Sequence, residues 1–162
     1  MRGYLGLGSN EGDRLAALRA ARGHIHAREA LAVVGASSVY ETAPQGEVLD
    51  QADFLNACLA VDTELGPEDL LDVCKEVERK LGRQQDAARH GPRPIDVDLL
   101  LLGDIEHRSE RLVLPHPALT ARRFVVEPLL ELDPGLELPG AIALAPLLEA
   151  VREQRIVRVG AM

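Results

Sequence analysis

The chain has 162 residues, 46% of them hydrophobic, with a formal net charge of −8 and a pI near 5.1. This length fits one domain around a single core, which we expect to span residues 1–162. The acidic balance, with no lysine and arginine stripe, argues against nucleic acid and anionic membranes as partners and favours small molecules. We find no signal-peptide pattern and no apolar run of the roughly 18 residues that a membrane span needs, so we expect a cytoplasmic protein.

The first half of the chain predicts a strand, a helix and two further strands. Residues 4–8 are apolar and end at a glycine turn, and the helix that follows has Ser9 or Asn10 as its expected N-cap. Residues 31–40 are rich in valine, serine and alanine, which indicates a second strand. A loop rich in turn-forming residues comes next, and residues 54–63 predict a third strand.

Glycines interrupt the start of the chain. The run from Gly6 to Gly12 has the spacing G-x-G-x-x-x-G, one residue longer than the fingerprint of a dinucleotide-binding turn. The later chain also lacks the repeated strand-helix units that would accompany such a fingerprint. We therefore interpret the run as a turn and helix cap.

The second half begins with a helix over residues 67–81, in which apolar residues recur at helical spacing. A strand starting at Ile95 follows, and residues 112–114 can add a short edge strand after a polar turn. Helices are expected over residues 122–131 and 146–155.

The resulting order is strand, helix, strand, strand, helix, strand. It predicts an α+β fold with a ferredoxin-like βαββαβ core, that is, a mainly antiparallel sheet with helices on one face. An irregular helical C-terminal tail would follow this core. The other face of the sheet would be left for a substrate.

Two aspartates at the start of the fourth strand form the first candidate site. Asp96 and Asp98 alternate with apolar residues, so both carboxylates project from one face, with their Cα atoms roughly 6.6 Å apart. Such a pair can hold hard divalent cations, although acid pairs at strand ends also serve as solubilising groups. Arg93 lies between two prolines and places a planar phosphate-binding group three residues before Asp96.

The polar and basic segment over residues 83–93 strengthens this candidate. It carries Arg83, Arg89 and Arg93 just ahead of the two carboxylates in an otherwise acidic chain. A phosphate clamp explains this composition better than a solvated linker does. The arginines could bind phosphate and the two aspartates could bind cations, so this part of the chain could bind a nucleotide with its metal ions.

Several ordered motifs make the chain resemble the 6-hydroxymethyl-7,8-dihydropterin pyrophosphokinase family over nearly its whole length. They are GLGSN at the start, YETAPQG at 40–46, DFLNA at 53–57, Glu78 before Gly82-Arg83, GPRPIDVDL at 91–99, and Arg111 with PHP at 115–117. The resemblance implies an enzyme of folate biosynthesis that moves diphosphate from ATP to a pterin alcohol and releases AMP. The chain departs from many relatives at Gln85 and His90, in the loop expected to close over the nucleotide.

The resemblance also implies roles for individual residues. Asp96 and Asp98 would bind two Mg²⁺ ions and act in catalysis together with Arg83 and Arg93. The pterin would stack between the two phenylalanines of the chain, and its contacts would be Thr42, Ala43, Pro44, Gln45, Gly46, Phe54, Asn56 and Phe124. The co-substrate ATP would contact Glu78, Arg83, Arg89, Arg93, Arg111, His116 and Arg122.

Two other functions fit parts of this pattern. A non-catalytic ferredoxin-like module that binds a small molecule would need neither the acid pair nor the arginine loop. A nucleotidyltransferase could use the same acid pair, but it would release pyrophosphate and not AMP. We expect ATP and 6-hydroxymethyl-7,8-dihydropterin as the partners, and a monomeric protein.

Overall fold

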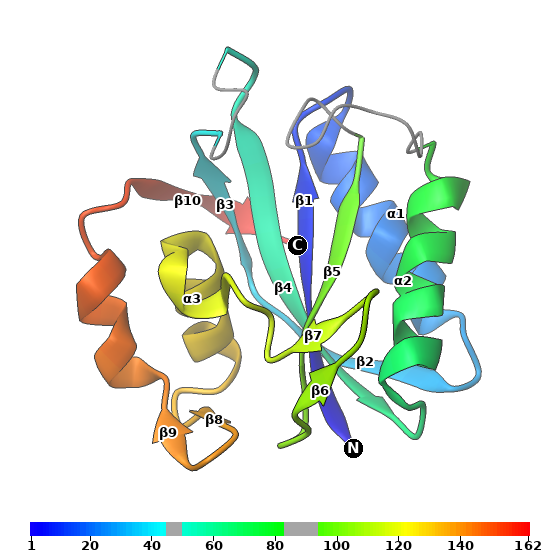
Figure 1. Ribbon diagram of the computed structural model, residues 1–162. Coiled ribbons are helices and arrows are strands. Elements are labelled where there is room, and N and C mark those ends of the chain that lie inside the picture. Colours follow the sequence, from blue (N-terminus) through cyan, green and yellow to red (C-terminus); the bar gives the residue numbers. More distant parts are fainter. Residues whose placement is uncertain (45–49, 83–93) are drawn as a thin grey trace.

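The computed structural model describes residues 1–44, 50–82 and 94–162. Within these ranges, a mixed α/β chain is built around a six-stranded sheet in which every pairing is antiparallel (Figure 1). Its strands are β1 (Arg2–Ser9), β2 (Leu31–Ala36), β3 (Ser38–Thr42), β4 (Phe54–Thr63), β5 (Asp96–Leu102) and β10 (Ile156–Ala161). They are ordered β10-β3-β4-β1-β5, and β2 also pairs with β4.

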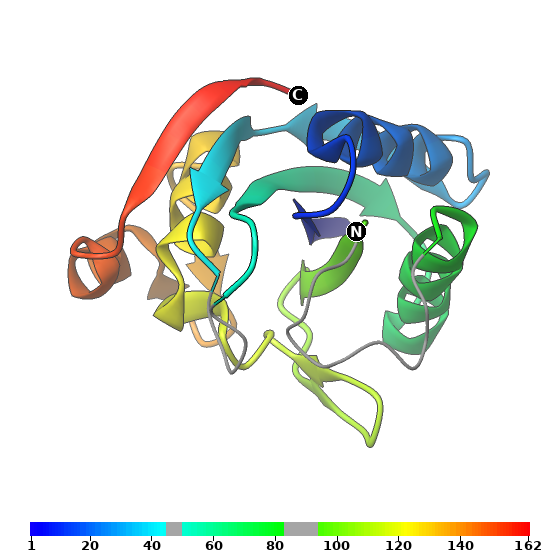
Figure 2. The ribbon, with the colours of Figure 1, turned by 90° about the horizontal axis from the view of Figure 1, so that it is seen from above.

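The remaining elements surround this sheet (Figure 2). The α-helices are α1 (Arg14–His26), α2 (Pro67–Lys80) and α3 (Arg123–Leu132), and the 3₁₀ helices are η1 (Leu119–Ala121) and η2 (Ala145–Val151). Two small hairpins pair β6 (His107–Arg108) with β7 (Val113–Leu114) and β8 (Glu137–Leu138) with β9 (Ile142–Ala143). Among the described helices, none combines the length and the apolar character that crossing a membrane requires.

The larger core lies between the sheet and the helices α1 and α2. Leu18 and Ile25 of α1 and Leu70 and Val77 of α2 are fully buried there, seven residues apart in each helix. Seven residues are close to two helical turns, so each pair faces the sheet from one stripe. The predicted helix over residues 67–81 is thereby confirmed to within one residue.

The sequence suggested that the opposite face of the sheet is left open for a substrate. In the structure, part of this face is covered. Helix α3 packs Val126 and Leu129 against Tyr4, Cys58 and other sheet residues in a second core. These side chains are apolar and lose contact with water on packing, which favours covering this part of the face. Within the described residues, a pocket lies at one end of this face, where Cys58, Leu100 and Val125 of the second core form part of its lining.

The strand predicted over residues 31–40 is two strands that meet at Ser37. Ala36 is opposite Leu59 and Tyr40 is opposite Asn56, so four steps along one chain match three along the other. This extra residue is a β-bulge, and the Ser37 hydroxyl takes part in it by accepting a hydrogen bond from Cys58 N at 2.8 Å. By contrast, the strand predicted over residues 54–63 is confirmed.

The ends of other elements also differ from expectation. Helix α1 is capped by Asp13 and not by Ser9 or Asn10, because the Asp13 carboxylate accepts a hydrogen bond from Ala16 N at 3.1 Å. The last predicted helix is the shorter 3₁₀ helix η2. The chain then returns as β10, whose largely exposed side chains show no buried pattern and which owes its place to backbone pairing with β3.

Candidate active site

The register of three strands creates the floor of the site. Gly8 of β1 lies opposite Asn56 of β4 on one side and Asp96 of β5 on the other. Gly6 lies in the same way between Cys58 and Asp98. Because glycine has no side chain, these two rows leave open space between the polar group on β4 and the carboxylates on β5.

A pocket occupies this space. Its walls come from the sheet, from the segment that follows β7, and from the first turn of α3. The residues that line it are Gly6, Leu7, Gly8, Thr42, Ala43, Phe54, Asn56, Ala57, Cys58, Asp96, Asp98, Leu100, His116, Ala118, Arg122, Phe124 and Val125. Aromatic and aliphatic surface thus meets a few convergent polar groups, as is typical of small-molecule sites.

One side of the pocket is aromatic and carries an amide. Phe54 begins β4 and is 8% exposed, while Phe124 lies in the first turn of α3 with the Arg122 guanidinium 5.7 Å from its ring centre. The Asn56 amide donates to the Thr42 hydroxyl at 2.7 Å, which orients its carbonyl oxygen. A Cβ at Gly8 would lie only 2.9 Å from this oxygen, so the asparagine needs a glycine beside it.

The other side of the pocket carries two carboxylates. Asp96 and Asp98 are both partly exposed and both line the pocket, which confirms that they project from one face of β5. No group of three or more His, Cys, Asp or Glu side chains in the described ranges is placed to hold a metal ion, and the pocket has only this pair of carboxylates. The pair fits Mg²⁺, which usually takes one or two carboxylates and completes its shell with water and substrate phosphate.

Glu78 supports this strand from behind. Its side chain is 3% exposed, and its carboxylate accepts a hydrogen bond from Val97 N at 3.0 Å and one from Lys75 Nζ at 3.2 Å. Val97 is the residue between the two aspartates, on an edge strand of the sheet. The predicted contact between Glu78 and ATP stays a prediction, and the structure adds a backbone contact that the sequence did not indicate.

His116 faces the carboxylates from the segment after β7. Its Nδ1 accepts a hydrogen bond from Ala118 N at 3.1 Å, so the proton of the neutral ring lies on Nε2. Burial lowers the pKa of His116, and Arg122 adds to this effect while Asp98 opposes it. The side chain is therefore a neutral hydrogen-bond donor at neutral pH.

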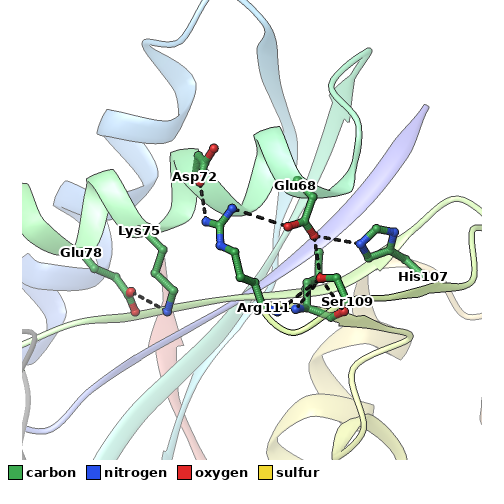
Figure 3. A network of polar contacts seen from close by, with 8 residues as sticks. Glu68, Asp72, Lys75, Glu78, His107, Ser109 and Arg111 are labelled. Carbon is green, nitrogen blue, oxygen red and sulfur yellow. Dashed lines mark hydrogen bonds and ion pairs between the residues drawn. The ribbon is translucent and has the colours of Figure 1, made fainter.

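A network fastens the β6-β7 hairpin to α2 (Figure 3). The Glu68 carboxylate is approached by His107 at 2.8 Å and accepts from the Ser109 hydroxyl at 3.0 Å, and Arg111 pairs with Glu68 and Asp72. The contact with His107 is the main reason why the pKa of Glu68 is lowered. Arg111 thus lies against α2, in a second groove that it lines together with Asp98, His116 and Lys75.

The structure brings most of the described candidates together. Thr42, Ala43, Phe54, Asn56, Asp96, Asp98, His116, Arg122 and Phe124 line one pocket. Pro44 follows Ala43 and is partly buried, while Glu78 and Arg111 lie in the positions given above. The predicted site residues Gln45, Gly46, Arg83, Arg89 and Arg93 lie outside the described residues, as do Gln85 and His90.

Sequence reasoning gave no role in the site to Gly6 and Gly8, which it placed in the first strand and in a glycine run interpreted as a turn and helix cap. Both are strand residues that form the pocket floor. Their spacing of two residues matches that of Asp96 and Asp98, and period-two glycines opposite period-two carboxylates are the signal that could have identified them.

Comparisons with known proteins identify the family of this chain. Residues 4–134 match the family model described as 7,8-dihydro-6-hydroxymethylpterin-pyrophosphokinase (HPPK). The chain is 48% identical over 139 residues to a 2-amino-4-hydroxy-6-hydroxymethyldihydropteridine pyrophosphokinase of Methylorubrum extorquens, covering 86% of this chain and 87% of that protein. The Bacillus subtilis protein of the same name is 43% identical over 134 residues, covering 83% and 79%.

Other similar proteins are longer. The mitochondrial folate synthesis bifunctional protein of Arabidopsis thaliana is 44% identical over 128 residues, which are 79% of this chain and 23% of that protein. A crystal structure of HPPK-DHPS in complex with substrates matches with a TM-score of 0.69 at 13% identity, over 92% of this chain and 43% of that chain. The wild-type Plasmodium falciparum HPPK-DHPS with pteroate gives 0.70 at 15% identity, over 92% and 42%. At these identities, the two crystal structures show likeness of fold alone.

Proposed function

The chain belongs to the 7,8-dihydro-6-hydroxymethylpterin-pyrophosphokinase family, and on that premise we propose how its pocket carries out the reaction. The reaction transfers pyrophosphate from ATP to the hydroxymethyl group of 6-hydroxymethyl-7,8-dihydropterin in folate biosynthesis. The observation that carries the proposal is the two-sided pocket, with an aromatic and amide side across Gly6 and Gly8 from two carboxylates.

The aromatic side would bind the pterin. Phe54 and Phe124 come from different elements and both line the pocket, which suits stacking of a flat ring between them. The Asn56 carbonyl, oriented by Thr42, can accept from an N–H of the pterin edge. This arrangement would direct the hydroxymethyl group across the glycine floor towards β5.

Asp96 and Asp98 would bind magnesium, and we propose two ions. Bound there, the ions would neutralise charge on the attacked phosphorus and on the leaving AMP. The protein's own part is positioning, because both carboxylates stand on a strand that is paired with β1 and tied to α2 through Glu78. Holding two reactants in line can supply about 7 to 11 kcal/mol of the barrier.

The nucleotide would lie on the α2 side of the carboxylates. The groove lined by Asp98, His116, Arg111 and Lys75 begins at the second of the two carboxylates and carries cationic groups. The neutral His116 can donate from Nε2 to a phosphate oxygen. Arg83, Arg89 and Arg93 would complete the phosphate contacts, and Arg122 would lie at the boundary with the pterin pocket.

Identification of the product tests this function. Incubation with ATP, magnesium chloride and the pterin alcohol should release AMP in equal amount to the pterin diphosphate. Release of ADP would overturn the diphosphoryl assignment, and release of pyrophosphate would favour a nucleotidyltransferase. A non-catalytic binding module would form no product at all.

The frame itself is, we propose, of the ferredoxin-like type and forms one domain. The chain order supports this, because β1, α1, the pair β2 and β3, β4, α2 and β5 follow one another as strand, helix, strand, strand, helix, strand. In the sheet, the strands lie in the order β3, β4, β1, β5, and α1 and α2 cover the same face. We propose a monomer, which sedimentation equilibrium would test.

A further inference from the structure

The carboxylate of Glu131, near the end of α3, accepts three hydrogen bonds from strand β3. Ser38 donates to Oε1 through its backbone N–H at 2.8 Å and through its hydroxyl at 2.6 Å. The Tyr40 hydroxyl donates to Oε2 at 2.8 Å. Ser38 is 5% exposed and Tyr40 is 7% exposed, so these donors have little access to water and depend on Glu131.

Strand β3 links the residues that contact Glu131 to the pterin side of the pocket. Ser38, Tyr40 and Thr42 alternate along the strand and therefore share one face of the sheet. Tyr40 lies opposite Asn56, and Thr42 lies opposite Phe54 and accepts the hydrogen bond from the Asn56 amide. A shift of β3 would move the group that orients Asn56.

Helix α3 links Glu131 to Phe124, the second aromatic ring of the pocket. Phe124 precedes Glu131 by seven residues, so both project from nearly the same side of the helix. They are about 10.5 Å apart along the helix axis at 1.5 Å per residue, and Ser38 and Thr42 are about 13 Å apart along the strand. Figure 2 shows α3 beside β3. Glu131 joins the two elements through Ser38 and Tyr40, and Phe124 and Thr42 both line the pocket.

Apolar packing alone does not determine this alignment. Val126 and Leu129 hold α3 against the sheet, but contacts between aliphatic side chains are non-directional and allow small sliding movements. Hydrogen bonds to a carboxylate are directional and are stronger than those between neutral groups. Three of them on one carboxylate define where α3 lies along β3.

We propose that Glu131, together with Ser38 and Tyr40, positions α3 so that the Phe124 ring lies at the correct distance from Phe54 to stack on the pterin. The inference rests on the proposed function, because it takes the pterin as the ligand between the rings. Glu131 does not line the pocket, so it acts through Phe124 and Thr42.

Three variants test the inference by isothermal titration calorimetry with 6-hydroxymethylpterin and, separately, with an ATP analogue that is not hydrolysed. Tyr40→Phe removes one donor and keeps the ring, Glu131→Gln removes the charge and keeps the size, and Ser38→Ala removes the second hydroxyl. We expect the Kd for the pterin to rise about tenfold in Glu131→Gln and less in the other two, because tenfold corresponds to the loss of about one good hydrogen bond. The Kd for the nucleotide should change by less than about twofold.

Matched controls separate positioning from general stability. Glu127→Gln alters a carboxylate one turn earlier on α3, where it pairs with Arg123 and not with β3, and should leave pterin affinity unchanged. Ser38→Thr restores a hydroxyl and should recover the affinity that Ser38→Ala loses. A variant that loses folded structure would weaken both ligands alike, and such a parallel loss overturns the inference.

The wild-type titration separates the proposed function from the positioning role of Glu131. If the wild-type protein binds no pterin even with the ATP analogue and magnesium present, the proposed function fails and this inference with it. If the wild-type protein binds and all three variants bind equally well, the proposed function stands and the positioning role of Glu131 is overturned. A selective loss of pterin affinity supports both.

Discussion

The carboxylate of Glu78 accepts a hydrogen bond at 3.0 Å from the backbone N–H of Val97, the residue between Asp96 and Asp98. Strand β5 lies at the edge of the sheet, and residues on such an edge have backbone N–H groups that no neighbouring strand can satisfy. A side chain of α2 therefore satisfies the backbone at the point where the strand carries its two carboxylates.

Replacing Glu78 by alanine should destabilise the protein by about 1 to 3 kcal/mol, because the Val97 N–H would be left buried without this acceptor. Glu78→Gln retains an acceptor oxygen and should lose less. Urea denaturation followed by circular dichroism gives both values. Glu76→Ala, on the same helix but in an ion pair at the surface with Arg28, should cost at most about 1 kcal/mol. Equal losses for Glu78→Ala and Glu76→Ala would show that the contact with Val97 is unimportant.

Asp98→Ala should lower kcat/KM about a thousandfold or more, since a bound metal supplies several kcal/mol of transition-state stabilisation. Pterin affinity should change little, because Phe54, Asn56 and Phe124 are untouched. A coupled assay for AMP and a calorimetric titration measure the two effects. Asp104→Ala, an exposed acid beyond the end of β5, serves as the control. Full activity of Asp98→Ala would rule out the metal-binding role.

Gly8→Ala should weaken pterin binding about tenfold, because the new Cβ would come within 2.9 Å of the Asn56 carbonyl oxygen and force it to move. The shift would also disturb the bond between Asn56 and Thr42. Gly23→Ala provides a contrast, because this residue lies inside α1 and the added Cβ would meet nothing within 4 Å apart from the neighbouring backbone of its own helix. That variant should be more stable by about 0.5 to 1 kcal/mol and bind normally. Normal pterin affinity in Gly8→Ala would contradict the geometry of the floor.

The acid sensitivity of stability should depend on Glu131. Burial acts to raise the pKa of Glu131, but the hydrogen bonds from Ser38 and Tyr40 outweigh this effect and, with Arg158 nearby, lower the pKa below its ordinary value of 4.5. Burial raises the pKa of Tyr40, and the hydrogen bond to the Glu131 carboxylate raises it further, so Tyr40 stays a neutral donor. A lowered folded-state pKa stabilises the protein fully above pH 4.5, and this contribution disappears as the pH falls through the folded value.

Unfolding free energies of the wild type and of Glu131→Gln between pH 7 and pH 3 test this expectation. The difference between the two proteins should be constant above about pH 5 and should shrink below it. A difference that stays constant down to pH 3 would mean that the hydrogen bonds do not favour the charged carboxylate. Glu127→Gln again serves as the control on the same helix.

Local patterns in the sequence were sufficient for most of the elements. The strand at residues 54–63 and the helix after Pro67 are confirmed because alternation, helical spacing and proline at a first helical turn act over a few neighbouring residues. The same holds for Asp96 and Asp98, whose shared face follows from the two-residue period of a strand. Motif order along the chain then identified the family.

Relationships between distant segments could not be read in this way. The bulge at Ser37, the return of β10 to β3 and the packing of α3 on the second face each depend on a partner far away in the chain. So do the glycine floor, in which Gly8 separates Asn56 from Asp96, and the contact of Glu131 with Ser38 and Tyr40. Periodicity reports which way a side chain points relative to its own segment, whereas strand register and helix docking decide which groups meet. The residue types therefore indicated the chemistry of the pocket. Its two-sided shape depends on the packing of β1, β4, β5 and α3, which the sequence alone did not reveal.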